Sequence, residues 1–224
     1  MRALGLDGFS KGWVAVSLDG DLHEIRFCRD IADVLSANFD RAAIDIPIGM
    51  TDDGERACDL LAREKLRPHS SRVFTGARRW LWREFSDPNA ANQDALRRGQ
   101  TRVSRQLWHL GPKIIEVDTF VRADGSRDIR EAHPELVFLR LNAGRPLPSK
   151  KSEAGIDLRR GLLKREGIKD IDKWLAGERI GTGAKRDDVL DACAVAIAAR
   201  DIADFVPEGM PPRDAYGLAI QIWS

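Results

Sequence analysis

The sequence predicts an α/β fold with a central mixed sheet and helices on both faces. Two observations lead to this prediction. The first fifty residues contain four apolar or alternating segments, with one helical segment before the fourth, which gives the order β-β-β-α-β. Helical patterns predominate later, and residues 185–200 are so rich in Ala, Val and Ile that they are typical of a buried helix.

The first three predicted strands form an antiparallel meander. Residues 2–7 are a short apolar strand, and the turn at 8–12 has glycine at both ends, which permits unusual backbone angles. Residues 13–18 follow as the second strand. Asp-Gly-Asp at 19–21 is a hairpin signal, and the alternating residues 22–28 form the third strand.

A helix then leads to a fourth strand that is buried on both faces. Asp30 stands where it can cap a helix over residues 31–39. Residues 42–49 are almost entirely apolar, and we expect this strand to end at Pro47. The meander is therefore followed by a crossover.

The middle of the chain is more helical. Gly111 and Pro112 are expected to break the helical pattern around them into two pieces. A fifth strand stops at Pro134, and residues 216–223 can form a final strand. We find no linker, so we expect one domain over residues 1–224 with a helical, basic insertion at about 52–110. Helices are predicted over residues 55–66, 88–100, 101–122, 135–142, 154–167 and 169–177.

Composition narrows the class of protein. No apolar run approaches the roughly 20 residues that span a bilayer, and Asp7 comes too early for a signal-peptide core. Cys28, Cys58 and Cys193 are scattered and form neither a disulfide framework nor a zinc motif. We therefore expect a cytoplasmic protein without membrane association.

Charge is unevenly distributed, although the net charge of the chain is only +1. From Arg56 to Arg105 there are twelve Lys or Arg against five Asp or Glu, so this segment is locally +7. A basic segment in such a chain suits a phosphate-bearing substrate. A solvated, arginine-rich helical surface explains the same composition equally well.

Four aspartates suggest a metal site. Asp188 and Asp191 lie three apart, on one face of the predicted buried helix. Asp7 and Asp45 each close a hydrophobic strand, and neighbouring strands would bring them to one edge of the sheet. Because such a cluster repels itself unless it binds a hard cation, we expect Mg²⁺ or Mn²⁺ there.

Each aspartate also has a simpler interpretation. For Asp7, the simpler interpretation is that it only accepts hydrogen bonds from the amides of the following turn. For Asp188, it is that the carboxylate interacts with the positive end of the helix dipole. The dipole explains Asp191 poorly, because Asp191 lies one turn deeper. Asp45 stands in an apolar strand, where a carboxylate without a partner or a metal is costly.

The strand order, with Asp on strands one and four and an acidic C-terminal helix, resembles the RNase H-like fold. The helix motif DDVLDACAVAIA is similar to the end of RuvC-type resolvases. More closely, the chain resembles the family of predicted RNase H-like nucleases known as domain of unknown function 429. The segments that carry this likeness run in order from Gly5 to about Ala199: GLDGFSKGWVAV, AIDIPIGM, RACDLLAR, SSRVF, PKIIEVD, EAHPELVF, SKK and DDVLDACAVA.

The resemblance implies a fold, a metal site and accessory residues. Glu131 and Glu135 could complete the cation shell, or they are a strand-end and a helix-start acid. Four basic residues in the matching segments could line the cleft or contact phosphate, and the alternative for each is a solvated surface charge. These are Arg72, Lys113, Lys150 and Lys151.

The preferred function is a metal-dependent nuclease that hydrolyses phosphodiester bonds of a nucleic acid by a two-metal mechanism. This reaction combines an anionic substrate, a poor leaving group and a charged transition state. One alternative is an actin-like nucleotide-binding or phosphotransfer protein, in which residues 7–12 cradle a phosphate. Another is a non-catalytic RNase H-like adaptor. The sequence does not decide whether the nucleic acid is DNA or RNA, or whether the protein forms a homodimer.

Overall fold

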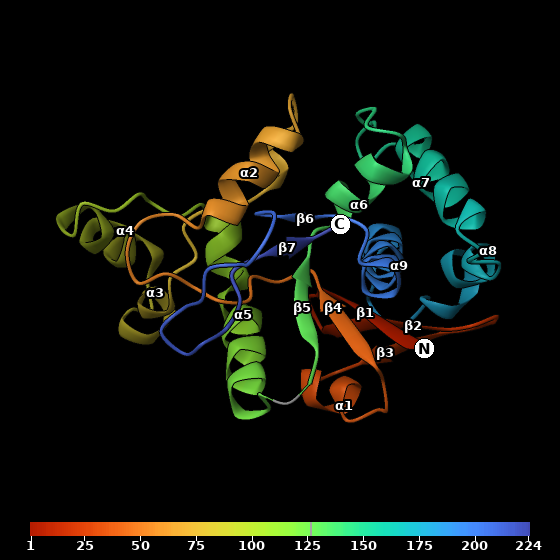
Figure 1. Ribbon diagram of the computed structural model, residues 1–224, viewed down its shortest axis with the longest axis horizontal. Helices are drawn as coiled ribbons and strands as arrows, with labels where there is room; N and C mark the ends of the chain where they lie inside the picture. The colour runs from red at the N-terminus through yellow and green to blue at the C-terminus, as the bar shows by residue number, and fades with distance from the viewer. Residues whose placement is uncertain (126) are drawn as a thin grey trace. The chain divides into compact units, whose positions relative to one another are not determined.

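A seven-stranded mixed sheet forms the centre of the part of the chain that the structure describes, residues 1–125 and 127–224 (Figure 1). The structure is a computed structural model. The strands lie in the order β3-β2-β1-β4-β5-β7-β6. Their bounds are β1 Arg2–Phe9, β2 Gly12–Asp19, β3 Leu22–Cys28, β4 Arg41–Ile44, β5 Ile129–Ala132, β6 Phe205–Val206 and β7 Ile222–Trp223.

The predicted β-β-β-α-β order is confirmed. β1 pairs antiparallel with β2, and β2 pairs antiparallel with β3. Gly20, in the turn between β2 and β3, has a φ of 59°, in the left-handed region that favours glycine. β4 is parallel to β1 and β5 is parallel to β4. β4 ends at Ile44, before the expected end at Pro47.

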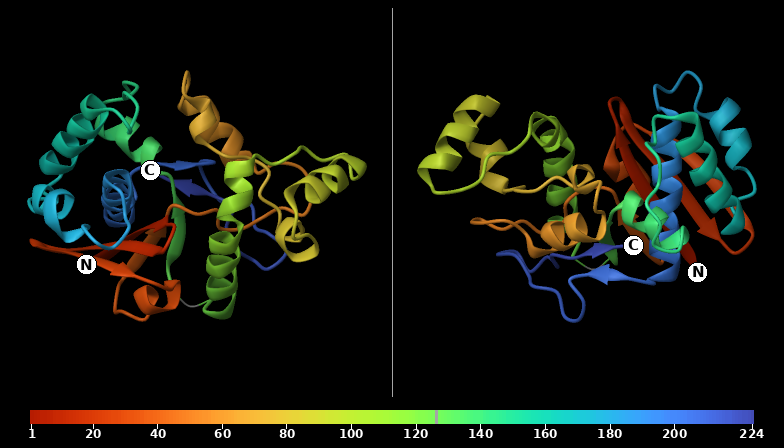
Figure 2. Two further views of the ribbon diagram at one scale, coloured as in Figure 1. Left: turned by 180° about the vertical axis from the view of Figure 1, so that it is seen from behind. Right: turned by 90° about the horizontal axis from the view of Figure 1, so that it is seen from above.

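Helices pack on both faces of the sheet, as the sequence predicts. α9 packs against β1, β2 and β4, and α1 contacts β2 and β3 on the opposite face (Figures 1 and 2). A π-helical turn at Trp174–Glu178 follows α8. The bounds are α1 Ile31–Leu35, α2 Ala57–Lys65, a 3-10 turn Ser70–Arg72, α3 Arg79–Glu84, α4 Pro88–Arg97, α5 Arg105–Ala123, α6 Pro134–Leu141, α7 Glu153–Arg165, α8 Ile171–Lys173 and α9 Arg186–Asp201.

The backbones of β1 and α9 come unusually close. A β-carbon added at Gly5 would lie 2.1 Å from the amide nitrogen of Ala196 and 2.4 Å from the carbonyl oxygen of Ala192. Glycine on the strand and two alanines one turn apart on the helix therefore allow this approach. This packing holds the acidic start of α9 over the end of β1.

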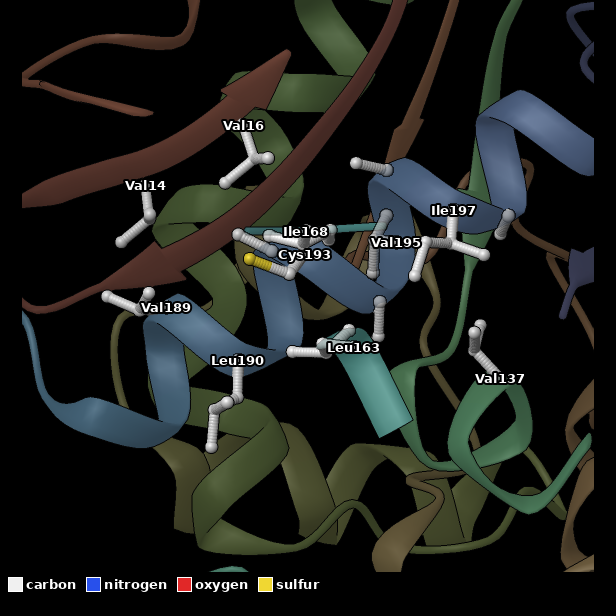
Figure 3. Close-up of a cluster of buried hydrophobic side chains, with 14 of the residues drawn as sticks. Val14, Val16, Val137, Leu163, Ile168, Val189, Leu190, Cys193, Val195 and Ile197 are labelled. Atoms are coloured by element: carbon white, nitrogen blue, oxygen red, sulfur yellow. The ribbon is translucent and has the colours of Figure 1, made fainter. Parts of the chain in front are cut away.

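The hydrophobic core surrounds α9, whose residues from Val189 to Ala199 are all buried. In Figure 3, Val14 and Val16 of β2 pack on one side of α9, and Leu163 of α7 belongs to the same cluster. Each such side chain, fully buried, contributes about 1.5–3 kcal/mol of hydrophobic free energy. The predicted buried helix is therefore confirmed.

The chain divides into two compact units. The first comprises Met1–Ile46, residues 127–205 and Trp223–Ser224, and the second comprises Pro47–Gly125 and Val206–Ile222. The predicted insertion at 52–110 lies wholly in the second unit. The assignment of a single domain over residues 1–224 stays a prediction.

The predicted break at Gly111 and Pro112 is wrong, because α5 continues through both residues. Proline removes the N–H that would bond the Trp108 carbonyl. The indole Nε1 of Trp82 donates to that carbonyl instead, at 3.1 Å. A β-carbon at Gly111 would lie 2.0 Å from the same Nε1, so glycine leaves room for the indole. Trp82 thus supplies the hydrogen bond that proline lacks.

A buried arginine organises the second unit. Both Nε and Nη2 of Arg79 donate to Asp118, at 2.8–3.0 Å, and Nη2 also donates to Asp214. The Tyr216 ring lies 4.7 Å from the Arg79 guanidinium and 3.5 Å from that of Arg122. These contacts hold residues 214–216 against α3 and α5.

The fold class is α/β, and its strand order is that of the RNase H-like fold, as the sequence predicts. In the described residues, no helix is both long and apolar enough to cross a membrane.

Candidate functional site

Asp7 and Asp45 lie side by side at the ends of two neighbouring parallel strands. Leu6 pairs with Ile44, and the Asp45 N–H donates to the Leu6 carbonyl at 3.0 Å. Asp7 directly follows Leu6, and Asp45 directly follows Ile44. The two aspartate side chains therefore emerge on the same face of the sheet. Asp7 is only 8% exposed.

That face is the one covered by α9. Asp7 has the same strand parity as Gly5, whose Cα faces Ala192 and Ala196 of α9. On the helix, Asp188 lies in the first turn and Asp191 one turn further, on the side that approaches the strand ends. The convergence of these residues, hereafter the aspartate cluster (Asp7, Asp45, Asp188 and Asp191), follows from the packing of β1, β4 and α9.

Asp188 has a structural role as well. Its Oδ2 accepts the backbone N–H of Lys185 at 2.7 Å, which completes a capping box at the start of α9. The interpretation of Asp188 as a helix-terminal acid is therefore correct for one of its oxygens. Asp188 is half-buried, and the bond leaves Oδ1 for other partners.

Asp191 has the most unusual environment. Its Oδ2 accepts a hydrogen bond from the ammonium of Lys150 at 2.5 Å, with the Asp191 side chain 3% and the Lys150 side chain 37% exposed. Its Oδ1 is buried, and among the described residues no donor bonds to it. A buried acceptor of this kind costs free energy unless something else satisfies it.

A buried ion pair supports the cluster. Nη2 of Arg159 on α7 donates to both carboxylate oxygens of Glu135 on α6, at 2.7 and 2.9 Å. Nη1 of Arg159 donates to the carbonyl of Pro148, just before Lys150. Glu135 is close enough for its negative charge to raise the pKa of Asp45 and of Asp191.

The four carboxylates influence one another. Burial, followed by the negative charges of Asp45 and Asp191, raises the pKa of Asp7 well above its usual range. Burial and the Asp191 charge raise the pKa of Asp45 to about 7. Burial, with Asp187 and Asp191, raises the pKa of Asp188 to about 6. Burial also raises the pKa of Asp191, which Lys150 opposes. Burial and mutual repulsion therefore destabilise the charged form of each carboxylate.

A family model described as a protein of unknown function, DUF429, matches residues 5–212. The chain belongs to the DUF429 family. The resemblance expected from the sequence segments is therefore confirmed, and the matched residues include the whole aspartate cluster and Lys150. No curated protein and no solved structure matches the chain. The likeness to RuvC-type resolvases stays a prediction.

The donor chemistry of this DUF429 site fits a hard divalent cation. Carboxylate oxygens are the ligands that Mg²⁺ and Mn²⁺ prefer, and the buried Asp191 Oδ1 has a lone pair to offer. As the side chains lie, however, residues 1–125 and 127–224 contain no group of three or more His, Cys, Asp or Glu that could hold a metal ion. Lys150 already contacts the central carboxylate, so an ion would have to replace its ammonium.

The other predicted site residues of the DUF429 chain are dispersed. Glu131 pairs with Ile44 and has the opposite parity to Asp45, so it lies on the other face of the sheet. Lys151 is exposed beside Lys150. Arg72, in the 3-10 turn, and Lys113, in α5, belong to the second compact unit, whereas the aspartate cluster belongs to the first.

Sequence reasoning missed two features of the site. Lys150 was expected either to contact phosphate or to be a solvated loop charge. The structure pairs it with Asp191, which neither alternative included, and its contact with phosphate stays a prediction. The Glu135–Arg159 pair was not expected, because Arg159 reads as a polar position of an amphipathic helix. One signal was available: Arg159 is on the same face of α7 as Ile156 and Leu163, which is unusual for a solvated arginine.

Proposed function

We propose that this DUF429 protein is a metal-dependent nuclease that hydrolyses phosphodiester bonds of a nucleic acid with Mg²⁺ or Mn²⁺. The observation that carries the proposal is the convergence of four aspartates from β1, the end of β4 and α9, with a buried acceptor on Asp191 that no described donor satisfies. A carboxylate cluster of this kind, desolvated and self-repelling, is best explained by a divalent cation.

In this proposal Asp7, Asp45 and Asp191 hold the metal, together with the free oxygen of Asp188. Bound divalent ions supply an activated water and stabilise the charge that develops on the phosphate oxygens. The protein contributes position: the close contact of Gly5 with Ala192 and Ala196 packs α9 against β1, the two elements that carry Asp7, Asp188 and Asp191. Asp7 and Asp191 are buried, which strengthens the attraction between their carboxylates and a bound cation.

The phosphate backbone is expected to contact basic residues around the cluster in the first unit. Lys11 lies in the β1–β2 turn, its side chain 3.1 Å from where a β-carbon would lie at Gly183, just before α9. Lys185 caps α9, and Lys151 follows Lys150; all three lysines are exposed. Exposed cations around an anionic centre suit a polyanion whose backbone is recognised through phosphate.

The basic segment at 56–105 contributes less than its composition suggests. Arg56, Arg78 and Arg79 are buried, at 1%, 0% and 3% exposed. Arg56 pairs with Asp59, and Arg78 donates to the carbonyls of Gly54 and Thr101. These guanidinium groups are committed to the structure of the second unit, which leaves fewer charges there for a nucleic acid.

Cleavage assays on the full chain test the proposal. Labelled single-stranded and duplex DNA, single-stranded RNA, RNA–DNA hybrid and a four-way junction are incubated with Mn²⁺, with Mg²⁺ or with EDTA. We expect cleavage of at least one substrate with metal, and a loss of about 100-fold or more in Asp45→Asn and Asp191→Asn. Asp21→Asn, in the exposed β2–β3 turn, is the matched control and keeps activity. Equal cleavage by all variants, or cleavage in EDTA, rejects the mechanism.

A non-catalytic adaptor is the second candidate. The Lys150–Asp191 pair favours it, because a resident cation can neutralise a cluster that no longer binds metal. Titration with Mn²⁺ separates the two candidates: an adaptor binds no divalent ion at the cluster, and Asp191→Asn leaves its metal-binding isotherm unchanged.

A further inference from the structure

Lys150 is presented to the aspartate cluster by a firmly held loop. The carbonyl of Ser149 accepts both the N–H and the hydroxyl of Ser152, at 3.0 and 2.8 Å, and Ser152 caps α7. A β-carbon at Gly155 would lie 2.0 Å from the Ser149 carbonyl oxygen, so the loop packs tightly on the helix. Arg159 holds the Pro148 carbonyl on the other side. The backbone at Lys150 is therefore fixed, and its side chain is the part that can move.

The ammonium of Lys150 acts on the whole cluster and not on Asp191 alone. Its positive charge lowers the pKa of Asp7, Asp45, Asp188 and Asp191 alike, against the effect of burial. The ammonium contacts Asp191 directly and reaches the other three aspartates through its charge, so a divalent cation bound by these carboxylates would compete with it.

The exposure of Lys150 distinguishes it from the buried arginine nearby. Its side chain is 37% exposed, so the ammonium can leave for solvent without crossing the core. Arg159 is fully buried and bound bidentately to Glu135, so it cannot leave. A lysine also has a flexible four-carbon stem and a compact charge, which suits reversible contact better than a planar guanidinium does.

We infer that Lys150 is a displaceable stand-in for the divalent cation: its ammonium occupies the cluster in the metal-free protein, and metal binding expels it toward solvent, where it is free to contact a substrate phosphate. This inference rests on the proposed cation site and adds a competition to it. The proton stays on Lys150 throughout, and no bond is made or broken. The cost of expelling Lys150 lowers the metal affinity of the free protein.

Isothermal titration with Mn²⁺ measures the competition. Lys150→Met keeps the length of the stem and removes the ammonium, and Lys151→Met removes the neighbouring exposed charge. If Lys150 competes, Lys150→Met binds Mn²⁺ about tenfold more tightly than the natural chain, which corresponds to about 1.4 kcal/mol. Lys151→Met changes the affinity much less. Equal or weaker binding by Lys150→Met overturns the inference, as does the absence of Mn²⁺ binding in every form.

Amine labelling of the unmutated protein provides a second measurement that does not depend on how the variants fold. An acetylating reagent is applied with and without Mn²⁺, and each modified lysine is quantified by mass spectrometry. We expect the labelling rate of Lys150 to rise several-fold with Mn²⁺, while that of Lys151 stays constant as an internal control. In Asp191→Asn, Lys150 should label rapidly without metal. A Lys150 rate that does not respond to Mn²⁺ contradicts displacement.

The two proposals fail in different ways. Tighter Mn²⁺ binding by Lys150→Met, with no cleavage of any nucleic acid, rejects the nuclease and keeps the displaceable lysine. Metal-dependent cleavage with equal Mn²⁺ affinity in both forms keeps the nuclease and rejects the displacement.

Discussion

Asp191 is the residue at which the structural and the functional demands on the site meet. One carboxylate oxygen bonds Lys150 and the other is buried with no donor among the described residues. A buried acceptor left in this state costs about 1–3 kcal/mol. The surrounding helix is almost entirely apolar, so an alanine or valine would pack there without that cost. The presence of aspartate at this position therefore supports the cation that we propose for the site.

The Arg159–Glu135 pair provides a prediction at the same scale. Arg159→Met deprives a buried carboxylate of a bidentate partner, so we expect the free energy of unfolding to fall by about 3–5 kcal/mol. Adding Glu135→Gln to this variant removes the buried charge and should recover part of the loss. Urea unfolding of the three proteins measures both effects. A loss below about 1 kcal/mol, typical of an exposed pair, would contradict this account.

At the scale of elements, the contact between β1 and α9 positions the cluster. Gly5→Ala places a methyl group 2.1 Å from the Ala196 amide nitrogen, and backbone atoms cannot move aside as side chains can. We therefore expect a loss of about 3 kcal/mol or more in the free energy of unfolding.

The matched control for this variant is Gly161→Ala in α7, where a β-carbon meets nothing within 4 Å. Alanine in a helix interior is favoured over glycine, so this variant should be more stable by about 0.5–1 kcal/mol. Urea unfolding compares the two directly. If both substitutions have the same sign, the close approach of β1 and α9 does not limit stability.

The sequence predicts elements well where the pattern is local. β1 to β4 and α9 follow from alternation and from runs of small apolar residues, and these elements alone bring Asp7, Asp45 and Asp191 together. Features that depend on distant partners are not predictable in this way. The continuity of α5 through Pro112 depends on Trp82, thirty positions earlier, whose indole replaces the missing hydrogen bond.

Lys150 illustrates the same limit at the site. Lys150 and Asp191 are forty-one positions apart in the sequence, and their pairing depends on how Arg159 holds the loop before α7. From the local sequence, a pair of lysines in a loop is interpreted as solvated charge. Nothing in that sequence indicates that α7 and α9 pack together. The aspartates were predictable because each lies on or beside a helix or strand with a clear hydrophobic pattern. Lys150 was not predictable as their partner, because it lies in a loop without such a pattern.

At the scale of the whole molecule, charge composition and charge availability differ. The +7 of residues 56–105 suggests a large basic surface, yet Arg56, Arg78 and Arg79 are buried and bonded within their own unit. These guanidinium groups add to the net charge of the segment, but they are not accessible to solvent or to a substrate. A net charge by segment therefore overstates the field that a nucleic acid would experience.

The pH dependence of global stability follows from the raised pKa values of the aspartate cluster. Unfolded, Asp45 and Asp188 titrate near their ordinary value of 3.8, and folded they titrate at about 7 and about 6. Between these values the folded chain binds more protons than the unfolded chain, so stability falls as pH rises. The contribution is fully present below about pH 4 and is lost by about pH 7. Urea unfolding in EDTA between pH 4.5 and 8.5 measures this slope.

Metal reverses the trend, because a divalent cation binds the deprotonated carboxylates. Adding Mn²⁺ should therefore raise the free energy of unfolding more at pH 8 than at pH 5. Asp45→Asn removes one of the groups that titrate, so its slope in EDTA should be smaller and its response to Mn²⁺ weaker. Asp21→Asn, whose side chain is 99% exposed, should follow the unmutated protein. A stability in EDTA that is flat or rises from pH 5 to pH 8 would mean that the carboxylates do not repel one another as their burial implies.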